Sequence, residues 1–517
     1  MRVSSRFLAP AAAAFVAATL VALLGLYASA DEPPPASGSV TLRLLGVNDF
    51  HGHLEPPRPG LGGAAWLAAH LDRATIPGRT IRVHAGDMVG ASPLISSWFH
   101  DEPSIEATNL MRFDVGTVGN HEFDEGGDEL LRLLRGGRRS GPEALERDAD
   151  GTAVNTSAPG YAGAAYPYVA ANTFDAEGQT LLPPYRIVER AGVRVGFIGV
   201  TTQSTPRFLL PRHAAGFRYG DLSEAVDRWV PDLRRRGVEA IVVLAHAGAP
   251  GRTGTEADDQ TGEVVAEARE MSDAVDLIVA GHSHTELNLR LPNASGRGDK
   301  LVVQALSYGV AFDRVDLTVD RRSGGVVAKG ATIAPTPHAD TPPEADVKAL
   351  VDRHAARIAP LAKRVVGETA TPLMRADGSL AELAADAQRA FARTDVALVN
   401  AGSIRADVDA GPILYEELFE AQAYDHPVVT LSLTGRELVE LIASTSPAVS
   451  GPSTDLDPAA TYSVAANELF VAGWPTTLRE RPTRVVGTEV EATAWHIARL
   501  TRGGNPAALQ STASRRR

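Results

Sequence analysis

The chain of 517 residues is far longer than a typical domain of about 150 residues, so we expect two globular domains, each with its own core. Its composition, 44% hydrophobic and 22% charged, is typical of a folded α/β protein and excludes a disordered or fibrous one. The net charge of −13 argues against a nucleic-acid polymer as partner, although a small phosphorylated molecule can still be bound locally. Cysteine is absent, which excludes disulfides, cysteine nucleophiles and thiolate metal sites.

The first thirty residues have the pattern of a signal peptide. Arg2 and Arg6 precede an apolar stretch at 8–26, and Ala28-Ser29-Ala30 forms a cleavage site of small residues. The alternative is an uncleaved membrane anchor, because the apolar stretch approaches the length of a membrane span. We expect cleavage near Ala30, no stable membrane insertion afterwards, and a secreted, periplasmic or otherwise extracytoplasmic protein.

Apolar runs alternate with helical stretches between residues 40 and 335, which is the pattern of a layered α/β domain. Several of these runs end directly in a polar cluster, and ligands bind at the carboxyl ends of strands in such sheets. The segment 135–159 is rich in Gly, Arg, Asp and Ser and predicts a surface insertion. The predicted strands are Val40–Val47, Thr80–His84, Val193–Val200, Ala240–Ala245, Leu277–Ala280 and Leu301–Gln304.

A stretch rich in Pro and Thr at 335–343 marks the boundary of a second domain. A helix with an apolar face is predicted directly after it, over Ala345–Leu361. In the second domain we predict helices at Leu380–Arg393 and Gly435–Ser444 and strands at Val396–Asn400 and Val428–Leu433. The division is therefore a signal peptide (1–30), a first domain (40–335), a linker with its helix (336–361), a second domain (362–500) and a disordered tail (501–517).

Five segments of the first domain place carboxylate, amide or imidazole side chains directly after an apolar run. One such segment is usually incidental. Five of them in one domain, mixing oxygen and nitrogen donors, favour a site for two divalent ions. The segments are Asn48-Asp49-Phe50-His51, Gly86-Asp87, Gly119-Asn120-His121-Glu122-Phe123-Asp124, His246 and Gly281-His282-Ser283-His284.

In these motifs the chain resembles the metallophosphatase superfamily, and more narrowly the exported bacterial 5'-nucleotidase and UDP-sugar hydrolase family. The resemblance is strong over 42–308 and looser over 365–470. It implies an α/β (α+β) protein in which a four-layer metallophosphatase β-sandwich, flanked by helices, is joined by a helical linker to a smaller α/β 5'-nucleotidase C-terminal domain.

The resemblance also implies the ligands of two divalent ions, which could be Zn, Mn, Co, Mg or Ca. A carboxylate shared by both ions would offset the repulsion of two dications about 3.5–4 Å apart. His284 stands where some members have Gln. The implied ligands are Asp49, His51, Asp87 and His284 for one ion and Asp87, Asn120, His246 and His282 for the other, with Asp87 bridging.

His121 and Asp124 resemble the His-Asp dyad of the family, in which the carboxylate orients an imidazole that stabilises the transition state. His53 and His84 lie beside the motifs, either as hydrogen-bond donors to ligands or as structural residues. The remaining histidines are interpreted as surface or core residues: His70, His100, His213, His338, His354, His426 and His496.

The second domain supplies the substrate-binding residues in this family. Asn400 and Arg405 match its substrate loop, and a guanidinium binds phosphate oxygens in pairs; the alternative is a surface ion pair. Arg375 lies near the position of a further substrate arginine. Tyr424 stands in place of the first base-stacking Phe. Phe470 or Trp474 could replace the second ring or could pack in the core, and the Asp of the usual Gly-Gly-Asp-Gly run is missing.

The sequence thus predicts an exported, metal-dependent phosphohydrolase, a 5'-nucleotidase that releases phosphate from nucleotides through attack of a metal-activated water. The alternative within enzymes is a 2',3'-cyclic-nucleotide phosphodiesterase or UDP-sugar hydrolase with the same metal core. A sulfur-compound hydrolase of related fold and a catalytically silent binding protein are further alternatives. The expected partner is a small nucleotide substrate, and the oligomeric state stays open.

Overall fold

The computed structural model describes residues 38–139, 145–147, 153–155, 160–253 and 261–502. The predicted signal peptide and nearly all of the predicted tail lie outside the described residues, as do parts of the predicted insertion. In the described parts of that insertion, β4 (Leu145–Arg147) pairs antiparallel with β5 (Ala153–Asn155). No helix among the residues described is long and apolar enough to cross a membrane.

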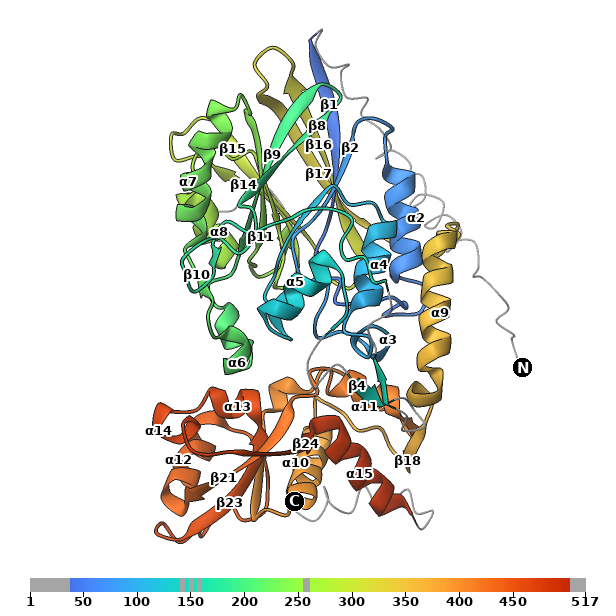
Figure 1. Ribbon diagram of the computed structural model, residues 1–517, viewed down its shortest axis with the longest axis vertical. Coiled ribbons are helices and arrows are strands. Elements are labelled where there is room, and N and C mark those ends of the chain that lie inside the picture. The colour runs from blue at the N-terminus through green and yellow to red at the C-terminus, as the bar shows by residue number, and fades with distance from the viewer. Residues whose placement is uncertain (1–37, 140–144, 148–152, 156–159, 254–260, 503–517) are drawn as a thin grey trace, which may run out of the picture.

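Two sheets pack face to face in the N-terminal domain (Figure 1). The space between them is filled by aliphatic side chains, such as Leu44 and Val83 from the first sheet and Val242 and Val279 from the second. In order across the sheet, the first contains β17 (Val326–Pro335), β16 (Ala311–Asp320), β1 (Ser39–Val47), β2 (Thr80–His84), β3 (Val115–Thr117) and β6 (Tyr168–Val169). The second contains β12 (Arg252–Thr253), β14 (Glu286–Pro292), β15 (Asp299–Ala305), β13 (Leu277–Ala280), β11 (Ala240–His246), β9 (Val193–Thr201) and β8 (Tyr185–Arg190).

Helices cover the outer face of each sheet, which completes four layers (Figure 1). The first sheet is covered by α2 (Ala64–Ala74) and α4 (Glu102–Leu110), and the second by α7 (Leu222–Arg235) and α8 (Glu263–Glu270). The predicted fold class is therefore confirmed. Shorter elements complete the domain: α3 (Leu94–Ser97), η2 (His121–Phe123), α5 (Gly127–Arg135), β7 (Thr173–Phe174), η4 (Thr205–Arg207), α6 (Pro211–Ala214) and β10 (Arg218–Tyr219).

All six strands predicted for this domain are confirmed as β1, β2, β9, β11, β13 and β15. β11 shows why the prediction works. It lies between β9 and β13 with parallel pairing on both sides, and each of its residues is buried, so an unbroken apolar run is required. Because β1, β2 and β3 are also parallel to one another, the carboxyl ends of both sets of strands point to one edge of the domain.

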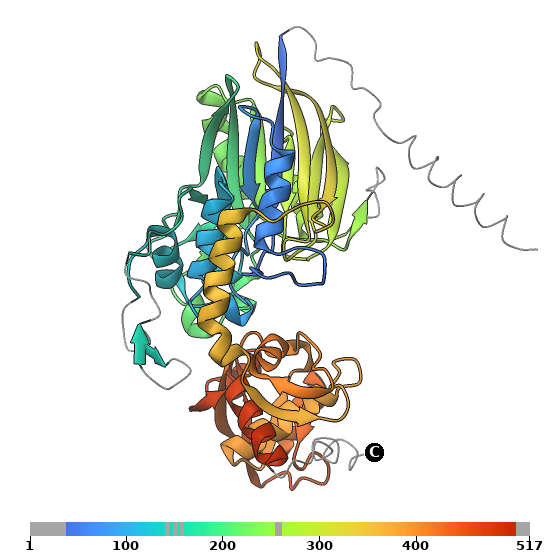
Figure 2. The ribbon, with the colours of Figure 1, turned by 90° about the vertical axis from the view of Figure 1, so that its right-hand side faces the viewer.

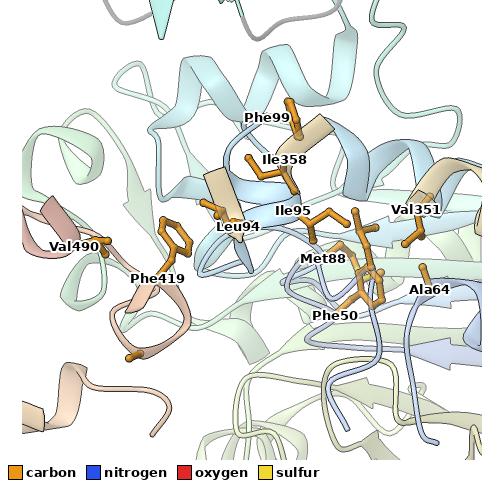
Figure 3. Packing of buried hydrophobic residues seen from close by; sticks show 14 of the residues in the cluster. Phe50, Ala64, Met88, Leu94, Ile95, Phe99, Val351, Ile358, Phe419 and Val490 are labelled. Atoms are coloured by element: carbon orange, nitrogen blue, oxygen red, sulfur yellow. The ribbon is translucent and has the colours of Figure 1, made fainter. Parts of the chain in front are cut away.

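The long helix α9 (Ala345–Ala362) joins the two domains (Figure 2). Its apolar face is the predicted one, with Val347, Leu350, Val351 and Ile358 buried. This face belongs to a core cluster that continues from the N-terminal domain through α9 into the C-terminal domain (Figure 3). The domains are thus packed together along α9 rather than joined by a free linker.

The C-terminal domain is built on a five-stranded mixed sheet, with helices on both faces (Figure 1). The two predicted strands and two predicted helices are present within one residue at each end. In order across the sheet, the strands are β22 (Ala448–Ser450), β19 (Val396–Val399), β23 (Thr461–Asn467), β21 (Pro427–Thr434) and β24 (Arg484–Thr488). The other elements are β18 (Val365–Thr369), α10 (Ser379–Ala392), η5 (Ala401–Ser403), β20 (Gly411–Leu414), α11 (Tyr415–Ala421), α12 (Gly435–Thr445), α13 (Glu468–Ala472), α14 (Thr476–Arg479) and α15 (Glu489–Thr501).

Candidate active site

The predicted ligand residues lie at the carboxyl ends of β1, β2, β3, β11 and β13, with His246 as the last residue of β11 and the others on the loops that follow their strands. Five of them have the left-handed backbone conformation that residues with a side chain rarely adopt: Asp49 (φ 49°), His51 (φ 48°), Asp87 (φ 50°), His282 (φ 74°) and His284 (φ 56°). Each such residue costs about 1–3 kcal/mol and persists only where the surrounding structure enforces it. Backbone strain of this kind, concentrated in one set of loops, indicates a functional site.

Glycine allows two of these loops to lie against each other. A Cβ atom on Gly119 would lie 2.1 Å from Oδ1 of Asp87 and 2.7 Å from the His246 ring, and one on Gly86 would lie 2.5 Å from the Gly119 nitrogen. Gly86 also has a φ of 85°. A side chain at position 119 would displace the Asp87 carboxylate, and one at position 86 would push the two loops apart, so both positions require glycine.

The structure brings the predicted ligands together in two groups. Ligand atoms of Asp49, His51 and His284 lie within 4.8 Å of one another, as do those of Asp87, His246 and His282. Asn120 joins the second group, since its Oδ1 lies 3.1 Å from Nε2 of His246 and 2.9 Å from Nδ1 of His282.

Asp87 lies between the two groups. Its Oδ2 is 3.0 Å from Nε2 of His246 in one group and 3.7 Å from Nε2 of His51 in the other. Its Oδ1 accepts a hydrogen bond of 2.9 Å from the backbone N–H of His121. A single carboxylate that faces both groups is what a shared ligand requires.

The hydrogen bonds of the histidines orient their free nitrogens toward the site. Nδ1 of His51 lies 2.8 Å from the carbonyl oxygen of Gly90, and Nδ1 of His246 lies 2.8 Å from that of Ala85. A carbonyl can only accept, so each Nδ1 carries a proton, and Nε2 faces other acceptors such as Asn120 Oδ1. An unprotonated Nε2 is itself an acceptor, so either a second proton or a metal ion must lie between it and the acceptor that it faces. The residues therefore fit a divalent cation.

The ionisable groups of the site are strongly coupled. Burial by itself would raise the pKa of Asp87, but the imidazoles of His246, His121 and His51 outweigh it and bring that pKa well below its usual range. Burial lowers the pKa of His246, yet Asp87 overcomes this and raises it to about 10. The Asp87 carboxylate therefore favours positive charge beside Nε2 of His246, which is where a cation bound to both residues would lie.

His121 and Asp124 form the predicted pair. Nδ1 of His121 donates to the Asp124 carboxylate at 2.8 Å, which leaves Nε2 of the ring available. Burial lowers the pKa of His121, but Asp124 and Asp87 together raise it to about 9. The imidazole is therefore cationic at neutral pH. His213, interpreted from the sequence as a surface or core residue, donates from Nδ1 to the backbone carbonyl of Asp124 and so supports the same pair.

A cavity of about 650 Å³ lies between the domains in front of these residues. The C-terminal domain contributes Arg405 and Tyr424 to its lining, opposite His121 and Asp87 from the N-terminal domain. The Tyr424 ring lies nearly parallel to His121, with 6.0 Å between ring centroids, and the Arg405 guanidinium is 5.7 Å from the Tyr424 centroid. Two of the predicted substrate-binding residues thus share one cavity with the candidate metal ligands.

The other predicted substrate-binding residues lie outside this lining. Arg375 donates from Nη1 to the backbone carbonyl of Arg405 at 2.9 Å and thus supports the loop. Asn400 is exposed, and its Oδ1 accepts from the backbone of Gly402 at 3.0 Å. Phe470 packs against the buried Trp474 in the core of the C-terminal domain, with 5.6 Å between ring centroids.

The sequence allows two roles for His53 and His84, either support of the metal ligands or a structural role, and the surroundings of the two residues differ. His84 is buried among aromatic rings, and its Nδ1 accepts from the backbone of Gly86 at 3.3 Å, so it supports the Asp87 loop. His53 lines the cavity and stacks on Tyr308, with 4.0 Å between ring centroids.

Several residues of the site have no signal in the sequence. Tyr308 and Phe208 line the cavity, but along the sequence they lie outside every motif. His426, placed among the structural histidines, stacks on Tyr424 with 5.5 Å between centroids and an interplanar angle of 3°. Glu122 lies inside one of the motifs, but the sequence predicts no role for it. Its carboxylate accepts hydrogen bonds from three backbone N–H groups of the ligand loops. An alignment of homologues would be the way to find such positions.

Comparisons with known proteins match this arrangement. The family model for calcineurin-like phosphoesterases matches residues 42–286, and the model for the 5'-nucleotidase C-terminal domain matches residues 362–468. The chain is a calcineurin-like metallophosphatase with a 5'-nucleotidase C-terminal domain. This confirms the family resemblance, and this family uses divalent metals.

Two relatives of this metallophosphatase are longer proteins. The chain is 34% identical to Endonuclease YhcR of Bacillus subtilis over 80% of its own length and 33% of that protein. It is 31% identical to Cell wall protein Lmo0130 of Listeria monocytogenes over 79% of its own length and 56% of that protein. The chain therefore spans about a third and about half of the lengths of these two relatives.

Solved structures agree on the fold. A 5'-nucleotidase precursor from Thermus thermophilus matches with a TM-score of 0.71 and 25% identity, over 89% of this chain and 97% of that one. The sulfate thiohydrolase SoxB matches with a TM-score of 0.63 and 17% identity, over 91% of this chain and 95% of that one. At that level of identity, the second match concerns the fold alone.

Proposed function

We propose that this metallophosphatase is an exported 5'-nucleotidase that hydrolyses phosphate monoesters of nucleosides with two divalent ions. The observation that carries the proposal is the shared cavity, in which two ligand groups on either side of Asp87 face Arg405 and Tyr424. The proposal includes the division of the chain into a catalytic part at 40–335 and a substrate-binding part at 362–500, with the helix of 336–361 between them.

Divalent ions held by the two groups would lower the pKa of a bound water, so that hydroxide is available near neutral pH to attack phosphorus, and would polarise a phosphoryl oxygen. The ligands proposed for them are Asp49, His51 and His284 on one side and Asn120, His246 and His282 on the other, with Asp87 shared.

The protonated His121 stabilises the negative charge that develops in the transition state. Its Nδ1 proton is bound to Asp124, so the Nε2 proton is directed away from that carboxylate and can be donated toward the leaving oxygen. Donation of this kind contributes mainly in the transition state, because the ester oxygen gains charge only as its bond to phosphorus breaks.

Arg405 binds the phosphate of the substrate. A guanidinium keeps its charge at all physiological pH values and donates two parallel hydrogen bonds to oxygen atoms of one phosphate. The backbone of Arg405 is held by the 2.9 Å hydrogen bond from Arg375 and by its own N–H, which donates to the carbonyl of Ala421 at 2.8 Å. Arg375 therefore contributes to the position of the binding group.

Export is part of the proposal. It is supported by the signal-peptide pattern of residues 1–30 and by the name of one relative, Cell wall protein Lmo0130. The mature protein is then expected to begin near Asp31. Amino-terminal sequencing of secreted protein tests this, and an intact Met1 on that material would favour a membrane anchor.

The name of the Bacillus relative raises a nucleic-acid polymer as another substrate. The net charge of −13 argues against it, because binding of a polymer depends on many phosphate contacts with a basic surface. A small nucleotide needs only the local charge of Arg405 and the metal ions.

A substrate screen with residues 31–517 tests the proposal, in which released phosphate is measured and all other products are separated by chromatography. It compares nucleoside mono-, di- and triphosphates, a 2',3'-cyclic nucleotide, UDP-glucose and a DNA oligonucleotide, each with Mn, Zn, Co, Mg or Ca. We expect metal-dependent release of phosphate from 5'-nucleotides, inhibited by a chelator. Preferential cleavage of the cyclic nucleotide, UDP-glucose or the oligonucleotide would replace the 5'-nucleotidase with that activity. No metal-dependent hydrolysis of any substrate would contradict the proposal as a whole.

A further inference from the structure

One peptide group, between Gly90 and Ala91, contacts both the candidate metal ligands and the His121–Asp124 pair. The carbonyl oxygen of Gly90 accepts a hydrogen bond of 2.8 Å from Nδ1 of His51. The N–H of Ala91 belongs to the same peptide group and donates to Oδ2 of Asp124 at 3.1 Å. Because a peptide group is planar and rigid, its carbonyl and its N–H cannot move independently. A displacement of the 90–91 peptide group therefore moves the partner of a metal ligand and the partner of Asp124 together.

The turn that contains this peptide group is strained. Gly90 has a φ of 79° and Ala91 has a φ of 47°, so both residues are in the left-handed conformation. An alanine adopts this conformation only where contacts from the surrounding structure enforce it. The turn therefore needs a partner from another element to stay in this position.

The carboxylate of Asp101 is such a partner. Its Oδ2 accepts a hydrogen bond of 2.9 Å from the N–H of Gly90, and its Oδ1 accepts one of 2.6 Å from the hydroxyl of Ser96. Asp101 directly precedes α4, and its carbonyl oxygen accepts from the N–H groups of Ser104 and Ile105 at 3.1 and 3.2 Å. The side chain is thus fixed at its base by a helix and at its end by two donors.

An aspartate at this position is unfavourable by itself. Asp101 is buried, with 8% of its surface exposed, and its hydrogen bonds to Gly90 and Ser96 come from neutral groups rather than cations. It also has a φ of 58°, which glycine or asparagine adopts more readily. The bond to Gly90 therefore gives this carboxylate a role that its own surroundings do not.

We propose that Asp101 is a positioning residue of the active site, which acts through the 90–91 peptide group on both His51 and Asp124. Its two bonds go to Gly90 and Ser96, neither of which is a candidate ligand, so it acts through the turn and not on the reacting groups themselves. The inference rests on the proposed function, because it concerns how the metal ligands and the proton donor of that reaction are held in place.

The position of this contact predicts an effect on only one of the two ligand groups. His51 lies in one group, and His246 lies in the other. Nδ1 of His246 is bound to the carbonyl of Ala85 and not to the 90–91 peptide group. Loss of the Asp101 carboxylate should therefore weaken metal binding by the His51 group alone, whereas a general loss of structure would weaken binding by both groups.

The test uses full-length mature protein with two substitutions of Asp101 and a matched control. Asp101→Gly removes the carboxylate without backbone strain, because glycine readily adopts a φ of 58°. Asp101→Asn keeps an oxygen for the N–H of Gly90, and its amide can donate to the hydroxyl oxygen of Ser96. Asp340→Gly is the control, because Asp340 is exposed and has nearly the same φ, 57°.

The first measurement is the binding of Mn to metal-free protein by calorimetry, without nucleotide. His284→Ala identifies which binding step belongs to the His51 group, because it removes one ligand of that group. The second measurement is kcat for a nucleotide at saturating Mn, and the third is the Tm of each variant, which shows whether it is folded.

We expect Asp101→Gly to weaken Mn binding by the His51 group about 10- to 100-fold, the range for residues that support metal ligands. Mn binding by the His246 group should not change. At saturating Mn, kcat should still be lower by about 10- to 100-fold, because Asp124 and the imidazole that it orients are misplaced. Asp101→Asn should restore both values, and Asp340→Gly should change neither.

Three results would each overturn the inference: no change in Mn binding and kcat in Asp101→Gly, equal weakening of both ligand groups, or equal losses in Asp101→Gly and Asp101→Asn. If Asp101→Gly does not fold, Ser96→Ala removes one partner of the carboxylate and should cause the same selective loss to a smaller extent. An unchanged Ser96→Ala would then overturn the inference. Protein that binds Mn but hydrolyses no nucleotide would contradict the proposed function alone, because the calorimetry tests the position of His51 without turnover.

Discussion

The backbone N–H of Asp87 donates a hydrogen bond of 2.9 Å to the carboxylate of Glu122. The same carboxylate also accepts from the backbone of Met88 at 2.8 Å and of Gly119 at 2.5 Å. Glu122 is 3% exposed, and all three of these bonds are to backbone N–H groups. One buried carboxylate therefore holds the loop after β2 against the loop after β3, and so fixes Asp87 relative to Asn120.

Glu122→Gln tests the importance of this link. An amide has one acceptor oxygen in place of two, so at least one of the three N–H groups loses a good partner. We expect metal affinity and kcat to fall by about 10- to 100-fold, the size typical of residues that support metal ligands. A titration of activity with Mn measures both values. Glu224→Gln on the exposed face of α7 is the control, and equal behaviour of the two variants would contradict the role of Glu122.

His121 and Arg405 are expected to affect different kinetic constants. His121→Ala removes a charge that is needed mainly in the transition state, so kcat should fall by about 10²- to 10⁴-fold while KM changes little. Arg405→Ala removes a group that binds the phosphate before and during the reaction, so KM should rise with a smaller change in kcat. Steady-state kinetics of both variants with one nucleotide measure kcat and KM and so test this separation of roles. A rise in KM alone for both variants would contradict the separation of roles.

Much of the fold was predictable because buried parallel strands leave a simple pattern. β11 and β13 are short and almost entirely apolar, and they are predicted within one residue of their bounds. β23 was missed although it lies at the centre of the C-terminal sheet. Its residues, Thr461–Asn467, include small side chains that pack against neighbouring strands but produce no strong apolar signal.

The candidate site was predictable only where residues lie within motifs. Asp87 and His246 could be grouped because each lies at the carboxyl end of a strand, and these strand ends reach the same edge. Phe208 could not be grouped with Tyr424, because no pattern within either segment indicates that residues 216 positions apart, in different domains, line one cavity. The choice of Phe470 followed the family pattern, whereas the structure places that ring in a core where it packs on Trp474.

Asp313 on β16 provides a test of stability that does not involve the candidate site. Its carboxylate is fully buried, and neither oxygen has a hydrogen-bond partner among the residues described. Burial, and to a lesser degree Glu286, raises the pKa of Asp313 well above its ordinary value. The folded protein thus keeps a proton that the unfolded chain releases near pH 4, and stability is lost as the pH rises toward the folded pKa.

Asp313→Asn removes this titration. We expect the variant to exceed the wild type in Tm at pH 8, by about 2–4 °C, which corresponds to about 1 kcal/mol in a domain of this size. The difference should shrink as the pH falls below about 4, where the wild-type carboxyl becomes protonated in both states. Thermal unfolding followed by circular dichroism across this range measures it. A difference in Tm that is the same at every pH would show that Asp313 does not titrate as argued.

The most direct measurement of the central claim is nucleotide hydrolysis by wild type and Asp87→Asn after chelation and stepwise return of Mn. If Asp87 is shared by two divalent ions, the chelated wild type should be inactive and should regain activity with added metal. Asp87→Asn should remain lower in kcat by at least about 10³-fold, because it loses the charge that offsets two dications. Near-normal turnover after chelation, or in Asp87→Asn, would contradict a catalytic centre of two ions bridged by this carboxylate.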